Sequence, residues 1–511
     1  MEHGPGWEAV LVDKKLASAL ALMLGMMSSP YILAQTSTEG DNNNQGQQLQ
    51  DMRKQILELQ NRLDDLQQKQ QATPASQTTS STSTSPNPGI TAGPLTLTFG
   101  GFTELAMIYR SRNETADVGS NFNTGMPLPN AHGYHTSEFR ESARQSRLSL
   151  LVQGPKGETS SAEAYFEADF LGAARTANSG ESNSYNPRLR HAYATYYNTN
   201  GFYVLGGQTW SLVTQEKTGM LPRQENIPLT IDAQYVPGFN WTRNSQLRFV
   251  QQFGKTWAMG FSVESPQANI YKQGTSAIIN NPGGSLFDPS NNYSLDVAPD
   301  LVAKVAWDPG YGHYELFGIG RWFRDRVDNQ NNTTFAGGGG GSALFNLIPK
   351  KLDFQASFMA GSGIGRYGSA QFPDATVKPN GKLDAIDMHQ FLVGLTYKPI
   401  DILQLYSYYG QEKADRTAYS VDGVGFGYGS SLYDNSGCDI EGSSACVGNT
   451  SKVSQVTVGG WWKFYQGGLG YMSAGLQGSY TRREIFSAIG GGPDTNEKII
   501  MASFRYYPYQ K

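Results

Sequence analysis

The stretch SAEAYFEADF at residues 161–170 alternates small or apolar side chains with polar ones. One face of an extended chain would carry Ala162, Ala164, Phe166, Ala168 and Phe170, and the opposite face Glu163, Tyr165, Glu167 and Asp169. A period of two is typical of a β-strand that lies between an apolar and an aqueous environment. The stretch therefore predicts a strand with one apolar side and one hydrated side.

Segments of the same texture fill the chain on both sides of this stretch, from Leu95 onward. Residues 389–398 repeat the pattern, with Phe391, Val393, Leu395 and Tyr397 opposite Gln390, Thr396 and Lys398. Turn residues separate sixteen candidate strands, at 97–110, 145–153, 161–171, 188–197, 202–210, 245–252, 256–264, 301–307, 313–322, 340–348, 352–360, 389–398, 402–410, 453–464, 470–481 and 497–507.

The links between these segments alternate in length without exception. The short links are 154–160, 198–201, 253–255, 308–312, 349–351, 399–401 and 465–469. The long links are 111–144, 172–187, 211–244, 265–300, 323–339, 361–388, 411–452 and 482–496. An antiparallel barrel with turns on one rim and loops on the other requires this alternation, whereas a β-sandwich does not. We therefore predict an all-β transmembrane barrel of about 16 antiparallel strands over residues 95–511.

Composition agrees with a barrel and excludes other classes. Charged residues make up 16% of the 511 residues, aromatic residues 12%, and there are 59 glycines. The mean hydropathy of −0.45 excludes a helical membrane protein. A net charge of −4 gives no case for nucleic acid binding. The six histidines are scattered, no nucleophile–base arrangement stands out, and we expect neither a metal, a cofactor nor catalysis.

The N-terminus has the pattern of a secretory signal. Lys14 and Lys15 precede an apolar run, 16–27, that is too short to cross a bilayer as a helix. We predict a signal peptide over residues 1–34 with cleavage after Ala34. The alternative is a buried N-terminal helix.

Residues 35–71 contain a heptad pattern. Apolar side chains recur at spacings of three and four, at Leu49, Met52, Ile56, Leu59, Leu63 and Leu66. This seam predicts a short α-helical coiled coil that self-associates, although the seam does not fix the number of chains. A lone amphipathic helix packed on its own barrel is the alternative. Residues 72–94, rich in Ser, Thr and Pro, predict a flexible linker.

The two cysteines, Cys438 and Cys446, lie close together in a segment rich in Gly, Ser and Asp. In an exported protein they are expected to form a disulfide that closes a small loop.

If the more apolar face of each strand meets lipid, the opposite face lines the inside. This gives nine candidate pore-lining or anion-binding residues: Arg147, Arg190, Arg248, Lys304, Arg321, Arg505, Glu163, Glu167 and Asp169. Arg147, Arg190 and Arg248 lie on the second, fourth and sixth strands and are expected to share one arc of wall. Guanidinium groups attract anions and bind carboxylates through two hydrogen bonds. The alternative is a structural charge ladder in which the acids neutralise the arginines.

The third long link, 211–244, follows Trp210 and combines length with mixed charge. Its charged residues are Glu216, Lys217, Arg223, Glu225 and Asp232. We predict that this link folds inward as a constriction loop. An ordinary surface loop is the alternative.

The chain also resembles the DcaP-like trimeric outer-membrane porins. The matching stretches are Gln145-Ser146-Arg147-Leu148, Phe166-Glu167-Ala168-Asp169-Phe170, Arg188-Leu189-Arg190-His191-Ala192-Tyr193, Gly207-Gln208-Thr209-Trp210-Ser211 and Gln246-Leu247-Arg248-Phe249. The resemblance covers nearly the whole chain after the signal and is strongest over residues 95–252. It implies a sixteen-stranded barrel, a trimer with periplasmic coiled coils, and diffusion of small anionic solutes such as dicarboxylates. It also implies that Arg147, Arg190 and Arg248 are pore arginines.

Two hypotheses from different classes follow. The first is a passive outer-membrane channel, a homotrimer in contact with lipid and lipopolysaccharide, with no enzymatic activity. The second is a surface-exposed adhesin or phage receptor that binds its partner through the long loops 265–300 and 411–452. A lipid-acting barrel enzyme is a third and weaker alternative.

Overall fold

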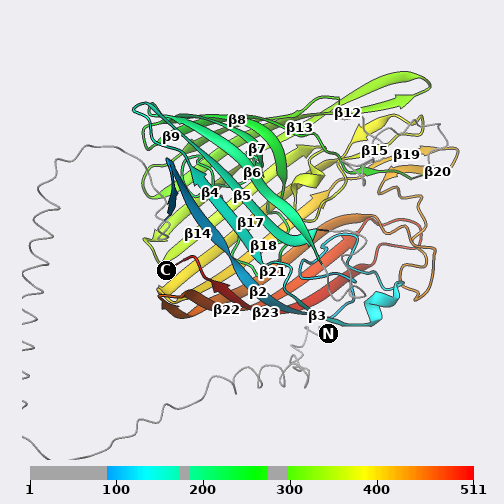
Figure 1. Ribbon diagram of the computed structural model, residues 1–511. Helices are drawn as coiled ribbons and strands as arrows, with labels where there is room; N and C mark the ends of the chain where they lie inside the picture. The colour runs from blue at the N-terminus through cyan, green and yellow to red at the C-terminus, as the bar shows by residue number, and fades with distance from the viewer. Residues whose placement is uncertain (1–88, 173–184, 274–296, 511) are drawn as a thin grey trace, which may run out of the picture. The chain divides into compact units, whose positions relative to one another are not determined.

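The computed structural model describes residues 89–172, 185–273 and 297–510. The expected signal peptide, the expected coiled coil and most of the expected linker lie outside the described residues. A single closed sheet dominates the described part (Figure 1).

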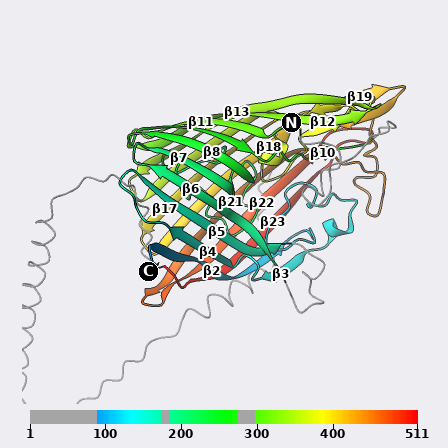
Figure 2. The ribbon, with the colours of Figure 1, turned by 45° about the horizontal axis from the view of Figure 1, so that its top comes forward.

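The sheet contains eighteen strands. Their bounds are β1 Ile90–Ala92, β2 Leu95–Arg110, β3 Glu138–Ser142, β4 Arg147–Gln153, β5 Ser160–Gly172, β6 Asn186–Asn198, β7 Phe202–Trp210, β8 Arg243–Phe253, β9 Trp257–Glu264, β11 Asp300–Trp307, β12 Gly312–Val327, β13 Gln330–Ile348, β14 Leu352–Ser362, β17 Asp387–Ile400, β18 Leu403–Ala414, β21 Thr450–Gly467, β22 Gly470–Ile485 and β23 Asp494–Tyr507. Neighbours in sequence pair antiparallel around the ring, and β2 closes it by pairing with β23 (Figure 2).

The barrel itself has sixteen strands, which confirms the predicted antiparallel barrel. Strands β3 and β4 are two halves of one wall strand, because both pair with β2. Strand β1 pairs only with β2, so Ile90–Ala92, which the sequence placed in the linker, adds a short flap at the short-turn rim. Each of the sixteen predicted segments coincides with a wall strand.

One predicted long link is wrong. Residues 323–339 form no loop, because β12 and β13 continue as a hairpin and pair from Gly312–Phe345 up to Val327–Gln330. Asp328 and Asn329 make the connection with φ values of 50° and 61°, a conformation that Asn and Asp tolerate best among residues with a Cβ. The polar strand ends hid this extension, since they lack the apolar alternation of the barrel wall. The hairpin projects beyond the neighbouring strands (Figure 1).

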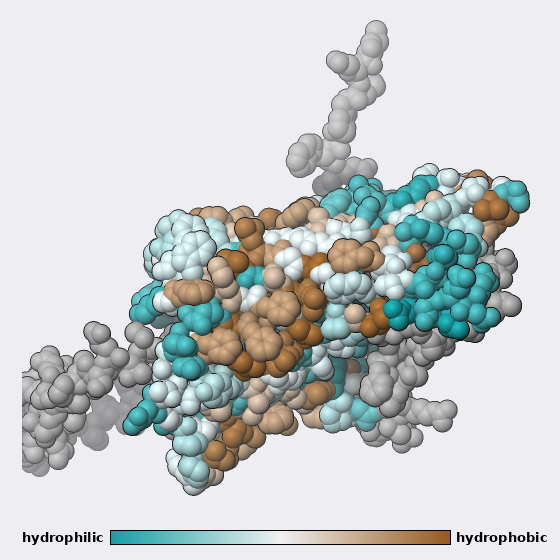
Figure 3. Space-filling model, turned by 90° about the horizontal axis from the view of Figure 1, so that it is seen from above, coloured by the Kyte–Doolittle hydropathy of each residue, from teal (hydrophilic) through white to brown (hydrophobic). Residues whose placement is uncertain are grey.

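The outer face of the wall is apolar. Large side chains that point outward include Phe166, Leu247, Phe261, Leu316, Phe335, Phe358, Val458 and Leu476, all strongly exposed in the isolated chain. Figure 3 shows apolar residues gathered over the barrel side and hydrophilic ones over the end that carries the long loops. A contiguous apolar surface of this kind is unfavourable in water and fits a lipid environment. Within the described residues, no helix is both long and apolar enough to cross a bilayer.

Aromatic rings line the rim where the short turns lie. Trp257 stacks on Trp307 with 5.7 Å between ring centroids, and Trp462 contacts Phe464 at 5.6 Å. Rings at this rim match the girdle of a transmembrane barrel. Not every ring of the wall strands belongs to the girdle, because Tyr406, Tyr408 and Trp461 are buried inside the barrel.

Smaller elements cover the long-loop end. Strands β10 (Ile270–Tyr271), β15 (Ala375–Val377) and β16 (Leu383–Ala385) form a three-stranded sheet, and β19 (Thr417–Val421) pairs with β20 (Val424–Tyr428). A disulfide joins Cys438 to Cys446 in the following loop.

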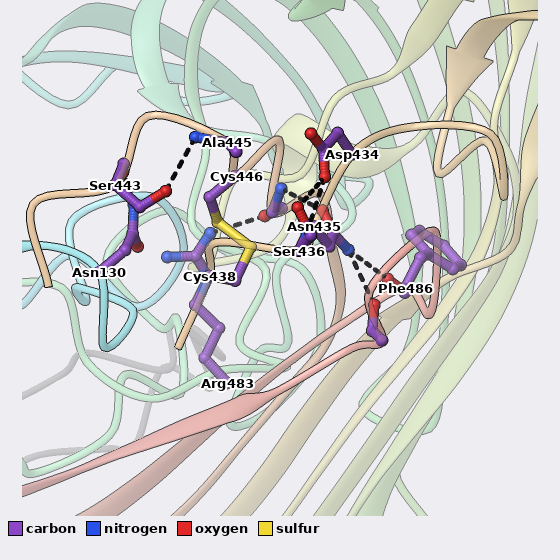
Figure 4. The surroundings of a disulfide bond; sticks show 12 residues. Asn130, Asp434, Asn435, Ser436, Cys438, Ser443, Ala445, Cys446, Arg483 and Phe486 are labelled. Atoms are coloured by element: carbon purple, nitrogen blue, oxygen red, sulfur yellow. Dashed lines mark hydrogen bonds between the residues drawn. A yellow bond between two sulfur atoms is a disulfide. The ribbon is translucent and has the colours of Figure 1, made fainter. Parts of the chain in front are cut away.

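The disulfide loop is held to the barrel by Arg483 of β22. Its Nη2 donates to the carbonyl oxygen of Gly448 at 3.1 Å and its Nη1 to that of Met126 at 2.5 Å. Figure 4 shows Arg483 directed toward the disulfide. Cys438 packs with Leu128 and Ile485 in a small apolar cluster. Arg483 and this cluster therefore hold the disulfide loop against the loop of residues 111–137.

Candidate functional site

Residues 211–242, here called the inner loop, fold into the barrel. The loop leaves β7 and reaches wall strands on the far side. The indole Nε1 of Trp461 donates to the carbonyl oxygen of Leu229 at 2.7 Å, and the backbone N–H of Ile231 donates to Oε1 of Gln477 at 2.7 Å. Because β21 and β22 are not neighbours of β7 or β8 in the sheet, these bonds run across the lumen.

Four wall carboxylates hold the inner loop by accepting hydrogen bonds from its backbone. Glu264 accepts from Leu212 at 2.9 Å, Glu315 from Glu216 at 3.1 Å, Asp308 from Gly219 at 2.9 Å and Glu412 from Gly238 at 2.8 Å. A buried N–H needs an acceptor, and a carboxylate is a strong one. The sequence reasoning missed these four acids. Three of them lie within wall strands and face inward, which was the available signal.

A second inward segment was also missed. Residues 363–386, here called the second inner loop, pack on the first. The backbone N–H of Trp241 donates to the carbonyl oxygen of Tyr367 at 2.9 Å, and the Thr242 hydroxyl donates to that of Arg366 at 3.1 Å. The two inner loops therefore narrow the lumen together.

The charged residues predicted for the inner loop differ in their burial and in their partners. Burial raises the pKa of Asp232 to about 6, although Arg110 opposes this rise, and burial raises the pKa of Glu216 well above its usual value. Burial likewise raises the pKa of Glu225. Arg223 binds Glu163 of β5 at 2.7 Å, whereas Lys217 is exposed. Only part of the loop's formal charge therefore acts on the lumen.

Charged side chains of β4, β5 and β6 form a ladder on the barrel wall. Arg190 binds Glu167 at 2.6 Å and Asp169 at 3.0 Å. Arg188 binds Asp169 at 2.7 Å, and Arg147 lies 3.5 Å from Glu167. The pairing of β5 with β6 shifts by one residue between Glu167 and Ala168. Because of this shift, the successive residues Arg190 and His191 are both buried inside the barrel.

Arg243, the first residue of β8, completes the set, and we call Arg147, Arg188, Arg190 and Arg243 the arginine cluster. The Arg243 guanidinium lies 4.7 Å from the ring centroid of Trp210. Among the described arginines it alone has neither a hydrogen bond nor an ion pair with a described residue. Four guanidinium groups thus face two carboxylates, which leaves an excess of positive charge. Sequence reasoning did not select Arg188 or Arg243.

Tyr235 of the inner loop lies against this cluster. Burial alone would raise the pKa of the Tyr235 hydroxyl, but the guanidinium groups of Arg190, Arg147 and Arg243 outweigh burial and lower it. The phenol therefore reports a positive potential at the point where loop and wall meet.

Three of the predicted pore cations do not line an open lumen, and this part of the prediction is wrong. Arg248 donates to Gln246 at 2.9 Å and to the Trp210 carbonyl oxygen at 2.5 Å. Lys304 binds Glu315 at 2.7 Å, and Arg321 binds Asp300 at 3.0 Å and Asp374 at 2.7 Å. All three point inward and are buried. Lys304, which also donates to the carbonyl oxygen of Thr214 at 2.7 Å, and Arg321 anchor the inner loops to the wall, whereas Arg248 joins β8 to β7. Nor does Arg248 share the cluster's carboxylates with Arg147 and Arg190.

Two cavities flank the narrowed region. The short-turn cavity, about 390 Å³, is lined by residues that include Arg147, Glu167, Arg223 and Arg505. Arg505 binds Glu104 at 3.0 Å there. The long-loop cavity, about 670 Å³, is lined by residues that include Trp210 and Arg243. Of the arginine cluster, Arg147 therefore lines the short-turn cavity and Arg243 lines the long-loop cavity, while Arg190 is buried.

Comparison with solved structures shows the same barrel fold in a solved outer membrane channel. The chain is similar to the outer membrane channel DcaP of Acinetobacter baumannii, with a TM-score of 0.59, 19% identity, and coverage of 82% of this chain and 99% of that chain. An anion-selective porin from Comamonas acidovorans aligns with a TM-score of 0.45 at 12% identity, over 81% and 99% of the two chains. OmpT, an outer membrane protein of Vibrio cholerae, aligns with a TM-score of 0.43 at 9% identity, over 82% and 99%. No protein-family model and no curated protein sequence matches the chain.

Proposed function

We propose that this protein is a passive diffusion channel of the bacterial outer membrane for small hydrophilic anions such as dicarboxylates. One observation carries the proposal: the arginine cluster holds four guanidinium groups against two carboxylates at a narrowing between the short-turn cavity and the long-loop cavity. An excess of fixed positive charge in a confined space attracts anions and excludes cations. No catalytic step is part of the proposal.

The membrane setting rests on the wall and on the sequence. The outward side chains form an apolar band bounded by aromatic rings, and such a band contacts lipid and lipopolysaccharide in an outer membrane. The N-terminal signal pattern directs export, and the heptad seam within residues 35–71 supports a homotrimer joined in the periplasm. The similarity to a solved outer membrane channel supports the same setting.

Planar-bilayer recording of the purified full chain in a KCl gradient tests the proposal. We expect stepwise conductance and a reversal potential displaced toward the chloride equilibrium potential. The double variant Arg147→Gln/Arg243→Gln removes two cluster charges that border the cavities and is expected to move the reversal potential toward that of potassium.

The matched control is Arg324→Gln, which removes an outward arginine of the β12–β13 hairpin whose side chain binds Thr333 at 3.2 Å. This variant should leave the reversal potential unchanged. Absence of conductance would refute a channel, and a cation-leaning wild type would refute anion preference. Native mass spectrometry with and without residues 49–69 tests the trimer, because loss of the coiled coil should weaken assembly.

A second candidate function, binding of a host or phage partner at the cell surface, is favoured by contacts that join two of the long loops. The disulfide loop and the loop of residues 111–137 are joined through Arg483 and through the contact of His132 with Glu441 at 2.9 Å. Loops that are held together before binding suit recognition by a protein partner, because less conformational entropy is lost on association. A barrel that never conducts in bilayers would favour this function over a channel.

A further inference from the structure

The long-loop cavity differs from the rest of the barrel interior in its charge. Its described lining residues include three arginines, Arg243, Arg366 and Arg483, and no Asp or Glu. The ladder and the short-turn cavity, by contrast, contain Glu167. Carboxylates pair with Arg147, Arg188 and Arg190 in the ladder, whereas no carboxylate is among the described lining residues of this cavity, which leaves a site with a strong preference for an anion.

Two of these arginines have unused capacity for hydrogen bonding. The Arg243 side chain makes no hydrogen bond to any described residue, and its guanidinium lies over the ring of Trp210. Arg366 donates through Nη2 to Asn244 and Gln267, each at 3.0 Å, while its Nη1 has no acceptor among the described residues. A guanidinium that is stacked or held on one side and free on another is prepared to bind an oxyanion.

The remaining polar wall is made of carboxamides. Six of the lining side chains that come from long loops are Asn121, Asn123, Gln267, Asn269, Gln371 and Asn449. The buried Oδ1 of Asn123 has no donor, and the buried Nε1 of Trp241 has no acceptor, among the described residues. Since carboxamides both donate and accept, this wall complements a solute that also does both.

Aromatic rings complete the cavity. Trp210, Trp241, Tyr271 and Tyr428 belong to its lining. Rings of this kind bury the apolar face of a flat or puckered ring, while their polar edges remain hydrated. The volume of about 670 Å³ lies within the usual range for small-molecule sites, roughly 300–1,000 Å³.

We propose that the long-loop cavity is a binding site for a sugar acid, a ring-shaped solute with one carboxylate and several hydroxyl groups. The carboxylate binds at Arg243 and Arg366, and the hydroxyls exchange hydrogen bonds with the carboxamide wall around Asn123. The inference deepens the proposed function, because such a site would collect solute at the mouth of an anion channel.

The chemistry of the wall separates this solute from its competitors. A simple dicarboxylate offers only acceptors when ionised, so it leaves the unpaired oxygen of Asn123 without a donor. A neutral sugar satisfies the carboxamides but gains nothing from the three arginines. Only a solute with both kinds of group uses the whole site.

Titration calorimetry of the detergent-solubilised full chain tests the site without requiring conductance. The probes are D-glucuronate, cyclohexanecarboxylate, which has a ring and one negative charge but no hydroxyls, and D-glucose, which has hydroxyls but no charge. We expect D-glucuronate to bind about tenfold more tightly than either control, which corresponds to one or two net hydrogen bonds.

Variants locate the two halves of the site. Arg366→Gln should weaken D-glucuronate about tenfold, as expected for loss of a charge-assisted bond. Asn123→Leu should bring the affinity for D-glucuronate close to that for cyclohexanecarboxylate. The control Asn331→Leu, on the exposed β12–β13 hairpin, should change neither affinity.

Equal binding of D-glucuronate and cyclohexanecarboxylate by the wild type would overturn the sugar-acid inference, as would equal binding of D-glucose. Absence of binding by all three would overturn it too. None of these results decides whether the chain conducts anions, which the bilayer recording in KCl measures separately.

Discussion

Gly410 of β18 lies directly against the carbonyl oxygen of Pro237 in the inner loop. A Cβ built on Gly410 would meet that oxygen at 1.7 Å. The next loop residue, Gly238, has a φ of 85° and donates its N–H to Glu412 at 2.8 Å. The inner loop is therefore seated on the wall at a place where only glycine fits.

Gly410→Ala is expected to lift the inner loop from β18, because neither backbone can yield by the distance required. Single-channel conductance should rise about twofold or its fluctuations should increase, since this loop narrows the lumen. Gly478→Ala on β22 is the control, because a Cβ there meets nothing within 4 Å. Identical conductance of Gly410→Ala and wild type would show that the loop does not limit the current.

Arg190→Met is expected to destabilise the barrel wall. It leaves Arg188 as the ion-pair partner of Asp169, and leaves Glu167 with Arg147 at 3.5 Å and with the hydroxyl of Tyr165 at 2.8 Å. Removal of one partner from a buried ion pair costs about 3–5 kcal/mol when the other charge is left unpaired, and we expect a smaller loss here because each carboxylate keeps one arginine. The heat-induced mobility shift of the folded barrel on gels measures this loss as a lower transition temperature.

The double variant Arg190→Met/Glu167→Gln provides the complementary measurement. It removes charge from both partners and should recover much of the stability. If Arg190→Met alone is as stable as wild type, the ladder does not brace the wall.

The seating of the inner loop should depend on pH through Asp232. Its pKa rises from 3.8 to about 6 because it is buried. A pKa that is higher in the folded state means that the folded loop holds the proton more tightly. Protonated Asp232 therefore stabilises the folded inner loop. This stabilisation is complete below the pKa of the unfolded chain, 3.8, and is lost as the pH rises through about 6.

We therefore expect more frequent loop fluctuations, seen as current noise, at about pH 8 than at about pH 4. The difference in the free energy of loop seating is about 3 kcal/mol. Asp232→Asn has the same shape and cannot titrate, so the noise of this variant should lose that pH dependence. Glu216 and Glu225 of the same loop, and Glu114, with a pKa raised to about 7, would account for any remaining dependence, because burial raises the pKa of all three carboxyl groups. Noise that increases on acidification would contradict the sign of this prediction.

Cys438→Ser/Cys446→Ser is expected to loosen the disulfide loop and leave the barrel intact. Loss of a disulfide that spans eight residues removes about 2–3 kcal/mol of stabilisation, because the open loop gains conformational entropy. Residues 436–447 should then be cleaved faster in limited proteolysis, while the heat-induced gel shift stays at the wild-type temperature. Unchanged cleavage would mean that Arg483 and the packing of Leu128 hold the loop without the disulfide.

The barrel could be predicted because its signals are local. Alternation along 161–170 depends only on which neighbours in sequence are apolar, and the lengths of the links depend only on where turn residues fall. Both follow from the period of an extended chain and from the presence of lipid on one side of the wall. The same reasoning put Arg147, Arg190, Arg248, Lys304 and Arg321 on the inner face, where they lie.

Which of these cations keeps a free charge was decided by the tertiary structure alone. Lys304 is neutralised by Glu315 on the next strand, and Arg321 by Asp374, which reaches it from a loop 53 residues away in the chain. Arg243, at a strand end where the alternation had already faded, is the one described arginine whose side chain has neither an ion pair nor a hydrogen bond with a described residue. A side chain's direction follows from its own strand, but the neutralisation of its charge depends on groups that only folding brings within a few ångströms, and no local pattern encodes that distance.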